Sequence, residues 1–139
     1  MEASARYLVF HGTVILLIGL LCGAPYGRAI NGGAAAHVVH SWRVAHLSLP
    51  IGAVLMFAVA PLFASFAVGG LTKQLIAGLL IVSGYSFGVA LPLAAWVGER
   101  GLSYRGPFKA KVVFAGNTLG AVTSLLGSLV LVYAAFESL

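Results

Sequence analysis

Acidic residues and cysteines are scarce in this 139-residue sequence. Asp and Glu together number 3, charged residues make up 8% of the chain, and Cys22 is its only cysteine. Soluble domains carry roughly a quarter charged residues, so this composition excludes an ordinary soluble domain. A single cysteine excludes an internal disulfide and a thiolate metal cluster, and we expect Cys22 to be a small buried apolar side chain. Glu2, Glu99 and Glu137 all lie at the ends of apolar runs, which disfavours proton transport along carboxylates.

Hydrophobic residues account for 60% of the chain and fall into four uncharged windows, at residues 7–27, 44–72, 74–98 and 112–136. A helix needs roughly 20 apolar residues to cross a membrane. We therefore predict an all-α protein, a single transmembrane domain over residues 1–139 that forms a four-helix bundle. Its spans are predicted at about 6–26, 43–68, 73–97 and 109–136. Pro25 after Gly23 and Ala24 disfavours signal-peptide cleavage there, so we expect the first span to be retained.

Basic residues divide between the two ends of these spans. An even number of spans puts both termini on one side, together with Arg6 and Lys73. The other side carries Arg28, Arg43, Arg100, Arg105, Lys109 and Lys111. By the positive-inside bias, loops 28–42 and 98–111 are expected to face the cytoplasm. Because the net charge of +5 is scattered and forms no stripe, we expect membrane lipid as a partner and no nucleic acid.

Pairs of glycines spaced four residues apart occur in three of the four windows. They are Gly19 and Gly23, Gly84 and Gly88, and Gly116 and Gly120. Such pairs form grooves in which another helix can approach closely. The same grooves would also suit a neighbouring subunit or the flat side of a planar cofactor, and a unit this small has little interior. We therefore expect a homo-oligomer.

Three of the four histidines lie in the segment HVVHSWRVAH, residues 37–46. At 100° per residue His37 and His40 are about 60° apart, and His46 points opposite His37. One helix face cannot gather all three, so a zinc site made from this segment alone is not expected. We interpret His37 and His40 as residues at the membrane boundary. His46 enters the uncharged window, where an ionisable side chain indicates function, and both an iron ligand and a structural hydrogen bond remain open.

His11 is the second histidine inside a predicted span. The first two spans run antiparallel, so His11 lies near the terminal side of the membrane and His46 nearer the opposite side. Their separation along the membrane normal is expected to exceed about 10 Å. The two imidazoles should therefore not hold one iron ion within one subunit.

Several short motifs follow one another in a recognisable order. They are Phe10-His11-Gly12, Trp42 four residues before His46, the FAVA segment at 57–60, Gly84, and Arg100-Gly101-Leu102. This order resembles the styrene oxide isomerases, small four-helix membrane enzymes of styrene degradation that convert an aryl epoxide to an aldehyde.

The resemblance implies a homotrimer in a bacterial inner membrane, with ferric haem b at the subunit interfaces. His46 would be the axial ligand of the iron, and Trp42 and Arg43 would contact the haem, Arg43 at a propionate. The chain would then be an isomerase in which the iron acts as a Lewis acid on a small apolar epoxide.

The resemblance is less complete where the substrate would bind. The family pattern has an asparagine six residues after the ligand histidine, and an asparagine and a tyrosine on the third span. Here these positions are Gly52, Phe87 and Leu91, which predicts a less polar substrate pocket. Tyr85 and Asn117 are candidate replacement contacts to substrate, or else helix-packing residues. The alternative function is a non-enzymatic b-type cytochrome or haem-binding protein, with His11 or a loop histidine of a neighbouring subunit as second axial ligand.

Overall fold

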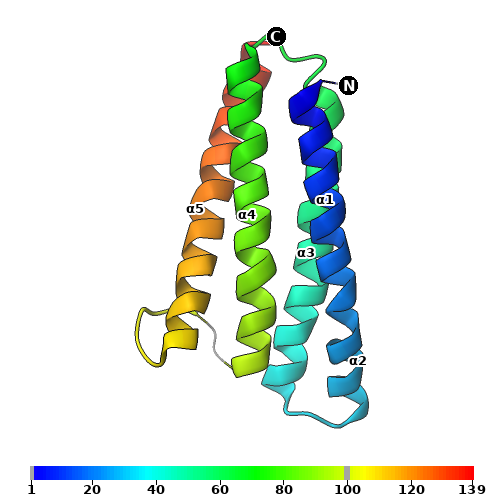
Figure 1. Cartoon of the computed structure of the whole chain (residues 1–139), viewed down its shortest axis with the longest axis vertical. Helices are drawn as coiled ribbons and strands as arrows, with labels where there is room; N and C mark the ends of the chain where they lie inside the picture. Colours follow the sequence, from blue (N-terminus) through cyan, green and yellow to red (C-terminus); the bar gives the residue numbers. More distant parts are fainter. Residues whose placement is uncertain (1, 99–100) are drawn as a thin grey trace.

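The computed structural model describes residues 2–98 and 101–139, which form five α-helices (Figure 1). These are α1 (Ala3–Leu21), α2 (Gly23–Asn31), α3 (Ala36–Leu62), α4 (Gly70–Val97) and α5 (Phe108–Phe136). Only Cys22 separates α1 from α2, so the two form one span in a four-helix bundle. Both termini lie at the same end of the bundle, as an even number of spans requires (Figure 1). The predicted all-α four-helix architecture is confirmed.

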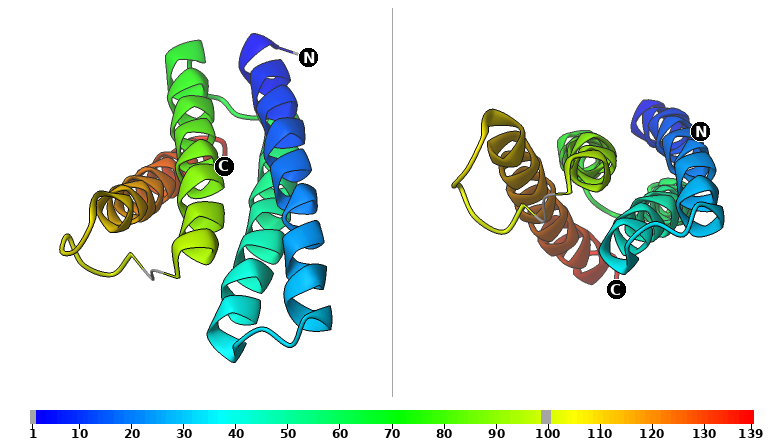
Figure 2. Two further views of the ribbon diagram at one scale, coloured as in Figure 1. Left: turned by 60° about the horizontal axis from the view of Figure 1, so that its bottom comes forward. Right: turned by 90° about the horizontal axis from the view of Figure 1, so that it is seen from below.

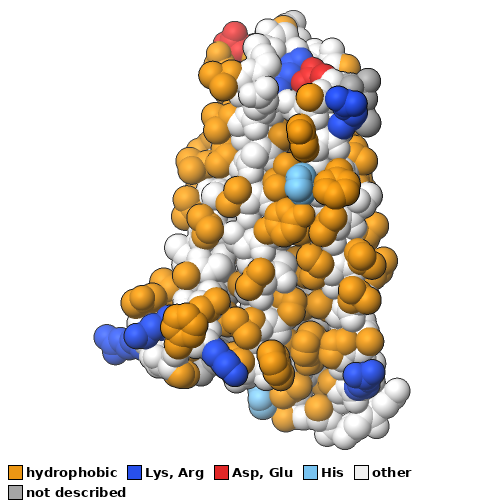
Figure 3. Space-filling view, viewed as in Figure 1, with side chains coloured by type: hydrophobic (Ala, Val, Ile, Leu, Met, Phe, Trp, Pro, Cys, Tyr) orange, Lys and Arg blue, Asp and Glu red, His pale blue; other side chains and the backbone are white. Residues whose placement is uncertain are grey.

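All four helical segments are long and apolar enough to cross a membrane. They have 27 to 29 residues and hydropathies of 1.8 to 2.1, with Ala3–Asn31 counted as one segment. Large apolar side chains cover the outside of the helices, among them Leu17, Leu47, Val54, Leu125 and Val132. Figure 3 shows a broad hydrophobic band with charged side chains gathered at its two ends. The chain is an integral membrane protein.

The first and third connections are shorter than predicted, whereas the second is longer than the predicted spans 43–68 and 73–97 leave room for. The predicted loop at 28–41 is reduced to residues 32–35, because α2 continues to Asn31 and α3 begins at Ala36. Gly33, with φ of 63°, ends α2 in the left-handed conformation, and Ala34 N–H donates to the Ala29 carbonyl at 2.9 Å. At its other end α3 stops at Leu62, and residues 63–69 form the connection to α4.

Proline explains the break between α1 and α2. Pro25 has no N–H, so the carbonyl of Leu21 loses its normal helical partner. Helix α1 ends at Leu21 and α2 begins at Gly23, and the side chain of Cys22 is buried at this break, as predicted.

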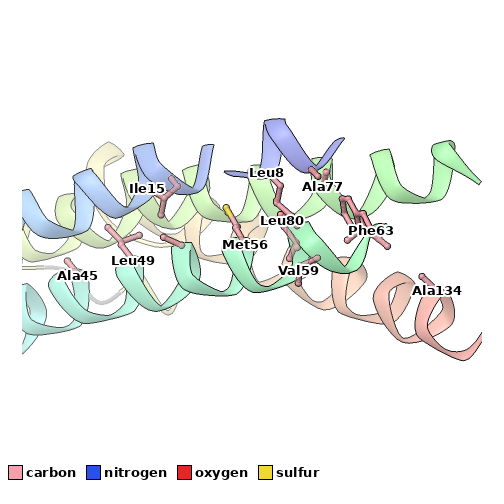
Figure 4. Packing of buried hydrophobic residues seen from close by; sticks show 14 of the residues in the cluster. Leu8, Ile15, Ala45, Leu49, Met56, Val59, Phe63, Ala77, Leu80 and Ala134 are labelled. Carbon is pink, nitrogen blue, oxygen red and sulfur yellow. The ribbon is translucent and has the colours of Figure 1, made fainter. Parts of the chain in front are cut away.

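Helices α1 and α3 form a closely packed pair whose core also includes α4. Leu8, Ile15, Leu49, Met56 and Leu80 fill the space between these helices (Figure 4). Two glycines of α1 permit the close approach. A Cβ atom at Gly12 would lie 2.8 Å from the Phe57 ring, and one at Gly19 would overlap Pro50. The predicted packing role of Gly19 is therefore confirmed within one chain.

Helix α5 packs mainly against α4, and within the described residues its backbone comes close to no other helix. A Cβ atom at Gly116 would lie 2.9 Å from Ala90 Cβ, and one at Gly120 would lie 2.9 Å from the Phe87 ring. The hydroxyl of Ser83 donates to the Gly120 carbonyl at 2.8 Å. Figure 2 shows that α5 lies across α4 at an angle rather than parallel to it.

Polar contacts hold the two ends of the bundle. At the terminal end, Lys73 Nζ forms an ion pair with Glu2 at 3.2 Å. At the opposite end, Lys109 lies over the Trp96 ring and Lys111 over the Tyr104 ring, each at 5.4 Å. Basic and aromatic side chains therefore gather at the predicted interface. Glu99 and Arg100 lie outside the described residues.

Candidate functional site

His46 lies on the side of α3 that packs against α1 and α2. Its Nδ1 is 2.9 Å from the carbonyl oxygen of Gly19. Its ring lies directly over Gly23, where a Cβ atom would be 3.0 Å from Cε1 and 3.2 Å from Nδ1. The ring of Tyr26 completes the surroundings, with centroids 5.9 Å apart. The half-buried imidazole is thus held by a backbone carbonyl, a glycine and an aromatic ring.

The hydrogen bond to the Gly19 carbonyl determines which nitrogen of His46 is available to bind a metal. A carbonyl oxygen can only accept a hydrogen bond, so Nδ1–H must donate. In the neutral ring Nε2 then carries the free lone pair, which is the arrangement found in metal-binding histidines. Trp42 and Arg43 lie about 40° and 60° from His46 around α3, on either side of it. Trp42 is partly buried against the core and Arg43 is exposed.

The donor set around His46 favours one kind of metal group. Within residues 2–98 and 101–139, no three His, Cys, Asp or Glu side chains gather closely enough to hold a metal ion. A single imidazole suits a metal that brings its remaining ligands with it, as haem iron does with four porphyrin nitrogens. The residues around His46 therefore fit a haem with one protein ligand.

His11 occupies a different place, between α1 and α4. Its Nδ1 shares a hydrogen bond with the Tyr85 hydroxyl at 2.9 Å, and the rings of Tyr7 and Phe10 lie beside it. His11 precedes Gly19, the partner of His46, by eight residues, which is about 12 Å along a helix. The two imidazoles are therefore too far apart to meet at one iron ion, as the sequence predicts.

An apolar cleft of about 340 Å³ opens between α3, α4 and α5. Gly52, Phe87 and Leu91, the three predicted pocket positions, all line it. Ile51, Leu55, Met56 and Leu80 make it apolar, and Ser48, Ser83 and Ser124 add hydroxyl groups. No atom lies within 4 Å of the position of a Cβ at Gly52, so this glycine leaves the cleft open. Tyr85, bonded to His11, does not line the cleft.

The cleft and His46 lie on opposite sides of α3. Ser48 and Leu55 line the cleft, and their positions are about 160° and 180° from His46 around the helix. A group bound at Nε2 of His46 would consequently not reach the cleft of the same chain.

A second, more polar cavity of about 580 Å³ adjoins the cleft at the basic end of the bundle. His37, His40, Ser41 and Asn117 line it, with Val44, Leu91 and Gly98. His37 and His40 are exposed, consistent with a place at the membrane boundary. The sequence did not predict that His37 and His40 share a cavity with Asn117, because this depends on how α3 and α5 are placed around α4.

The contacts of His46 were also missed from the sequence. The only signal was the spacing of Gly19 and Gly23, which indicates a groove without saying what lies in it. The structure shows that the absence of a side chain at Gly19 makes room for Pro50, and that its absence at Gly23 makes room for the His46 ring.

A sequence model of the family described as styrene oxide isomerase matches residues 4–136, nearly the whole chain. No curated protein matches the chain significantly.

Proposed function

The chain belongs to the styrene oxide isomerase family, and from that premise we propose that it is a membrane-bound, haem-dependent isomerase that rearranges an apolar aryl epoxide to an aldehyde. The single observation that carries the haem part of this proposal is the environment of His46. Its Nδ1–H is committed to the Gly19 carbonyl at 2.9 Å, which leaves Nε2 free as a ligand. When bound, ferric haem b supplies a Lewis acid for the epoxide oxygen.

The residues around His46 have distinct roles in this proposal. The Gly19 carbonyl fixes the tautomer of the imidazole, and Gly23 provides the flat surface on which the ring rests. Arg43, one helical turn before His46 and exposed, is placed to pair with a haem propionate. Trp42 supplies an apolar surface beside the ring.

The apolar cleft is the proposed substrate pocket. Opening an aryl epoxide leaves a carbocation beside the aromatic ring, which water would trap as a diol. Side chains such as Ile51, Leu55 and Phe87 exclude water, so that migration of a hydride within the substrate can complete the aldehyde. Gly52 and Leu91 offer no side-chain hydrogen bonds, so the substrate is held mainly by shape.

The positions of His46 and the cleft lead to a proposal about assembly. Because they lie on opposite sides of α3, we propose a homotrimer in which His46 of one copy faces the cleft of the next. A cyclic trimer repeats this head-to-tail contact three times and closes. The trimer would lie in a bacterial inner membrane, with loops 28–42 and 98–111 in the cytoplasm.

The proposal is tested by purifying the protein in detergent and measuring its haem content, its Soret absorption and its turnover of styrene oxide. We expect ferric haem whose spectrum shifts when an epoxide is added. His46→Ala should lose both haem and activity. His40→Ala, a histidine of the same helix that lies away from Gly19, is the matched control and should retain them. Full haem and full activity in His46→Ala would overturn the proposal.

A second candidate is a b-type cytochrome without enzymatic activity. The observation that favours it is the lack of hydrogen-bonding side chains at Gly52, Phe87 and Leu91 in the cleft. It predicts reversible reduction with two strong axial ligands and no spectral response to epoxides. Spectra of the oxidised and reduced protein, with and without epoxide, distinguish the two functions.

A further inference from the structure

Three hydroxyl groups line the otherwise apolar cleft, and they differ in their hydrogen bonds. Ser83 of α4 donates to the Gly120 carbonyl at 2.8 Å. By contrast, within residues 2–98 and 101–139 no hydrogen bond is found for the hydroxyl of Ser48 on α3 or of Ser124 on α5. Two of the three hydroxyls are therefore available to a bound molecule.

A serine inside a membrane helix commonly satisfies its hydroxyl locally, by donating to the backbone carbonyl four residues earlier. Ser41, Ser86 and Ser128 do so here, at distances of 2.7 to 2.9 Å. Ser48 does not, although it is exposed on the apolar cleft side of α3. A hydroxyl without a partner in apolar surroundings is costly, and an acceptor atom on a bound molecule would remove that cost.

Ser48 lies at nearly the same membrane depth as His46. Helix α3 runs along the long axis of the bundle, and the three-fold axis of the proposed trimer follows the membrane normal, because every copy crosses the membrane in the same direction (Figure 1). Rotation about that axis leaves the depth of each atom unchanged. His46 of one copy and Ser48 of the next therefore differ in depth by only two helical residues, about 3 Å. Ser48 also points about 160° away from His46 around α3, into the cleft.

Ser124 lies at a different depth. It follows Gly120, whose carbonyl accepts from Ser83, by about one helical turn toward the terminal end. The residue after Ser83 is a glycine against which the Met56 side chain of α3 packs. Met56 follows Ser48 by eight residues, about 12 Å along the helix. Ser124 is therefore at the far end of the cleft from Ser48 and from the depth of the proposed iron ligand.

We infer that the hydroxyl of Ser48 donates to the oxygen of the bound epoxide and so orients the substrate. This inference rests on the proposed function, because the trimer decides which part of the cleft faces His46. The aryl group then extends along the cleft toward Leu55, Met56 and Leu80, where the lining is apolar. Ser48 thereby makes the cleft specific for a ligand that carries an acceptor oxygen at one end of an apolar body.

A binding test that needs no turnover compares acetophenone with α-methylstyrene, in which a methylene group replaces the carbonyl oxygen. Affinities are measured by equilibrium dialysis of the purified protein in one detergent. Wild type should prefer acetophenone by about fivefold more than Ser48→Ala does, the value of one neutral hydrogen bond. Comparing the two proteins cancels the partitioning of each ligand into micelles and every contribution that does not come from residue 48.

Three further variants identify the source of this preference. Ser48→Cys keeps the size of the side chain but donates only weakly, so it should behave as Ser48→Ala does. Ser124→Ala removes the other available hydroxyl and should not remove the preference for acetophenone. Ser128→Ala is the control, since its hydroxyl bonds to a backbone carbonyl and does not line the cleft.

An equal preference in wild type and Ser48→Ala would overturn the inference, as would a loss of preference in Ser124→Ala instead. Turnover of styrene oxide is the second measurement. Ser48→Ala should retain haem and lose about fivefold in kcat/KM, whereas Ser128→Ala should lose nothing. A change in binding without one in kcat/KM would overturn the assignment of Ser48 as a substrate contact. Full haem and full activity in His46→Ala would overturn the proposed function, while the dialysis measurement would still decide whether Ser48 contacts a ligand oxygen.

Discussion

At the scale of single residues, the sequence identifies His46 but not what holds it. An ionisable side chain inside an apolar run is costly, and this is visible without a structure. The Gly19 carbonyl and the Gly23 surface lie more than twenty residues away in the chain. Their contact with His46 depends on the register of α1 and α2 against α3, which hydropathy does not report.

Gly23→Ala should weaken haem binding by about tenfold or more, the loss typical when a group supporting a metal ligand is disturbed. The added methyl group would lie 3.0 Å from Cε1 of His46 and would push the ring away from the Gly19 carbonyl. Gly27→Ala is the control, since no atom lies within 4 Å of its Cβ position. Both substitutions replace glycine by alanine in α2 and so raise helix propensity alike. A difference in haemin affinity between the two variants therefore reports the contact between residue 23 and the His46 ring. Equal affinities would show that Gly23 does not position His46.

Tyr85→Phe should lower the free energy of unfolding by about 0.5–1.5 kcal/mol and leave haem binding unchanged. The reason is that the Tyr85 hydroxyl bonds to His11, away from both His46 and the cleft. Tyr133→Phe removes an exposed hydroxyl and serves as the control in unfolding by a denaturing detergent. Loss of haem in Tyr85→Phe with unchanged stability would instead place Tyr85 and His11 at the cofactor.

At the scale of the helices, two kinds of contact are found. The α1 and α3 pair is joined through Gly12 and Gly19 and shares a core with α4, whereas the backbone of α5, within the described residues, closely approaches only that of α4. The glycine pairs predicted that close contacts exist. They could not predict which helices meet, because each of these helices is apolar on all sides and shows no single packing face.

Gly116→Leu should separate α5 from α4 and destabilise the protein by about 1–3 kcal/mol, the usual cost of overpacking. A Cβ atom there would lie 2.9 Å from Ala90 Cβ and 3.2 Å from the Ser86 carbonyl oxygen, and a backbone atom cannot rotate away. Gly78→Leu on α4, where a Cβ meets nothing within 4 Å, is the matched control. Denaturation of both variants measures the difference. A Gly116→Leu protein as stable as Gly78→Leu would mean that α5 is held elsewhere.

At the scale of the whole molecule, the number of spans and the common side of the termini could be predicted, because the length and hydropathy of each segment decide them. The cavities could not. They arise because α5 packs against α4 and leaves one side of α3 uncovered. The cavities therefore depend on the relative positions of three helices (Figure 2). The same arrangement brings Gly52 of α3 together with Phe87 and Leu91 of α4 in the cleft and leaves His46 on the opposite side of α3.

Complementation between two inactive variants tests whether the site forms between copies. His46→Ala removes the proposed iron ligand, and Gly52→Trp fills the cleft from a position that has open space around it. If His46 of one copy serves the cleft of the next, coexpression should restore about a quarter of wild-type activity, since each site then needs one copy of each kind in the right order. If one chain supplied both halves, every site would carry a defect. A mixture of wild type with the double variant controls for expression and assembly. If the coexpressed pair assembles normally but its activity stays at background, the complete site lies within a single chain. That result would contradict the proposal that His46 of one copy serves the cleft of the next.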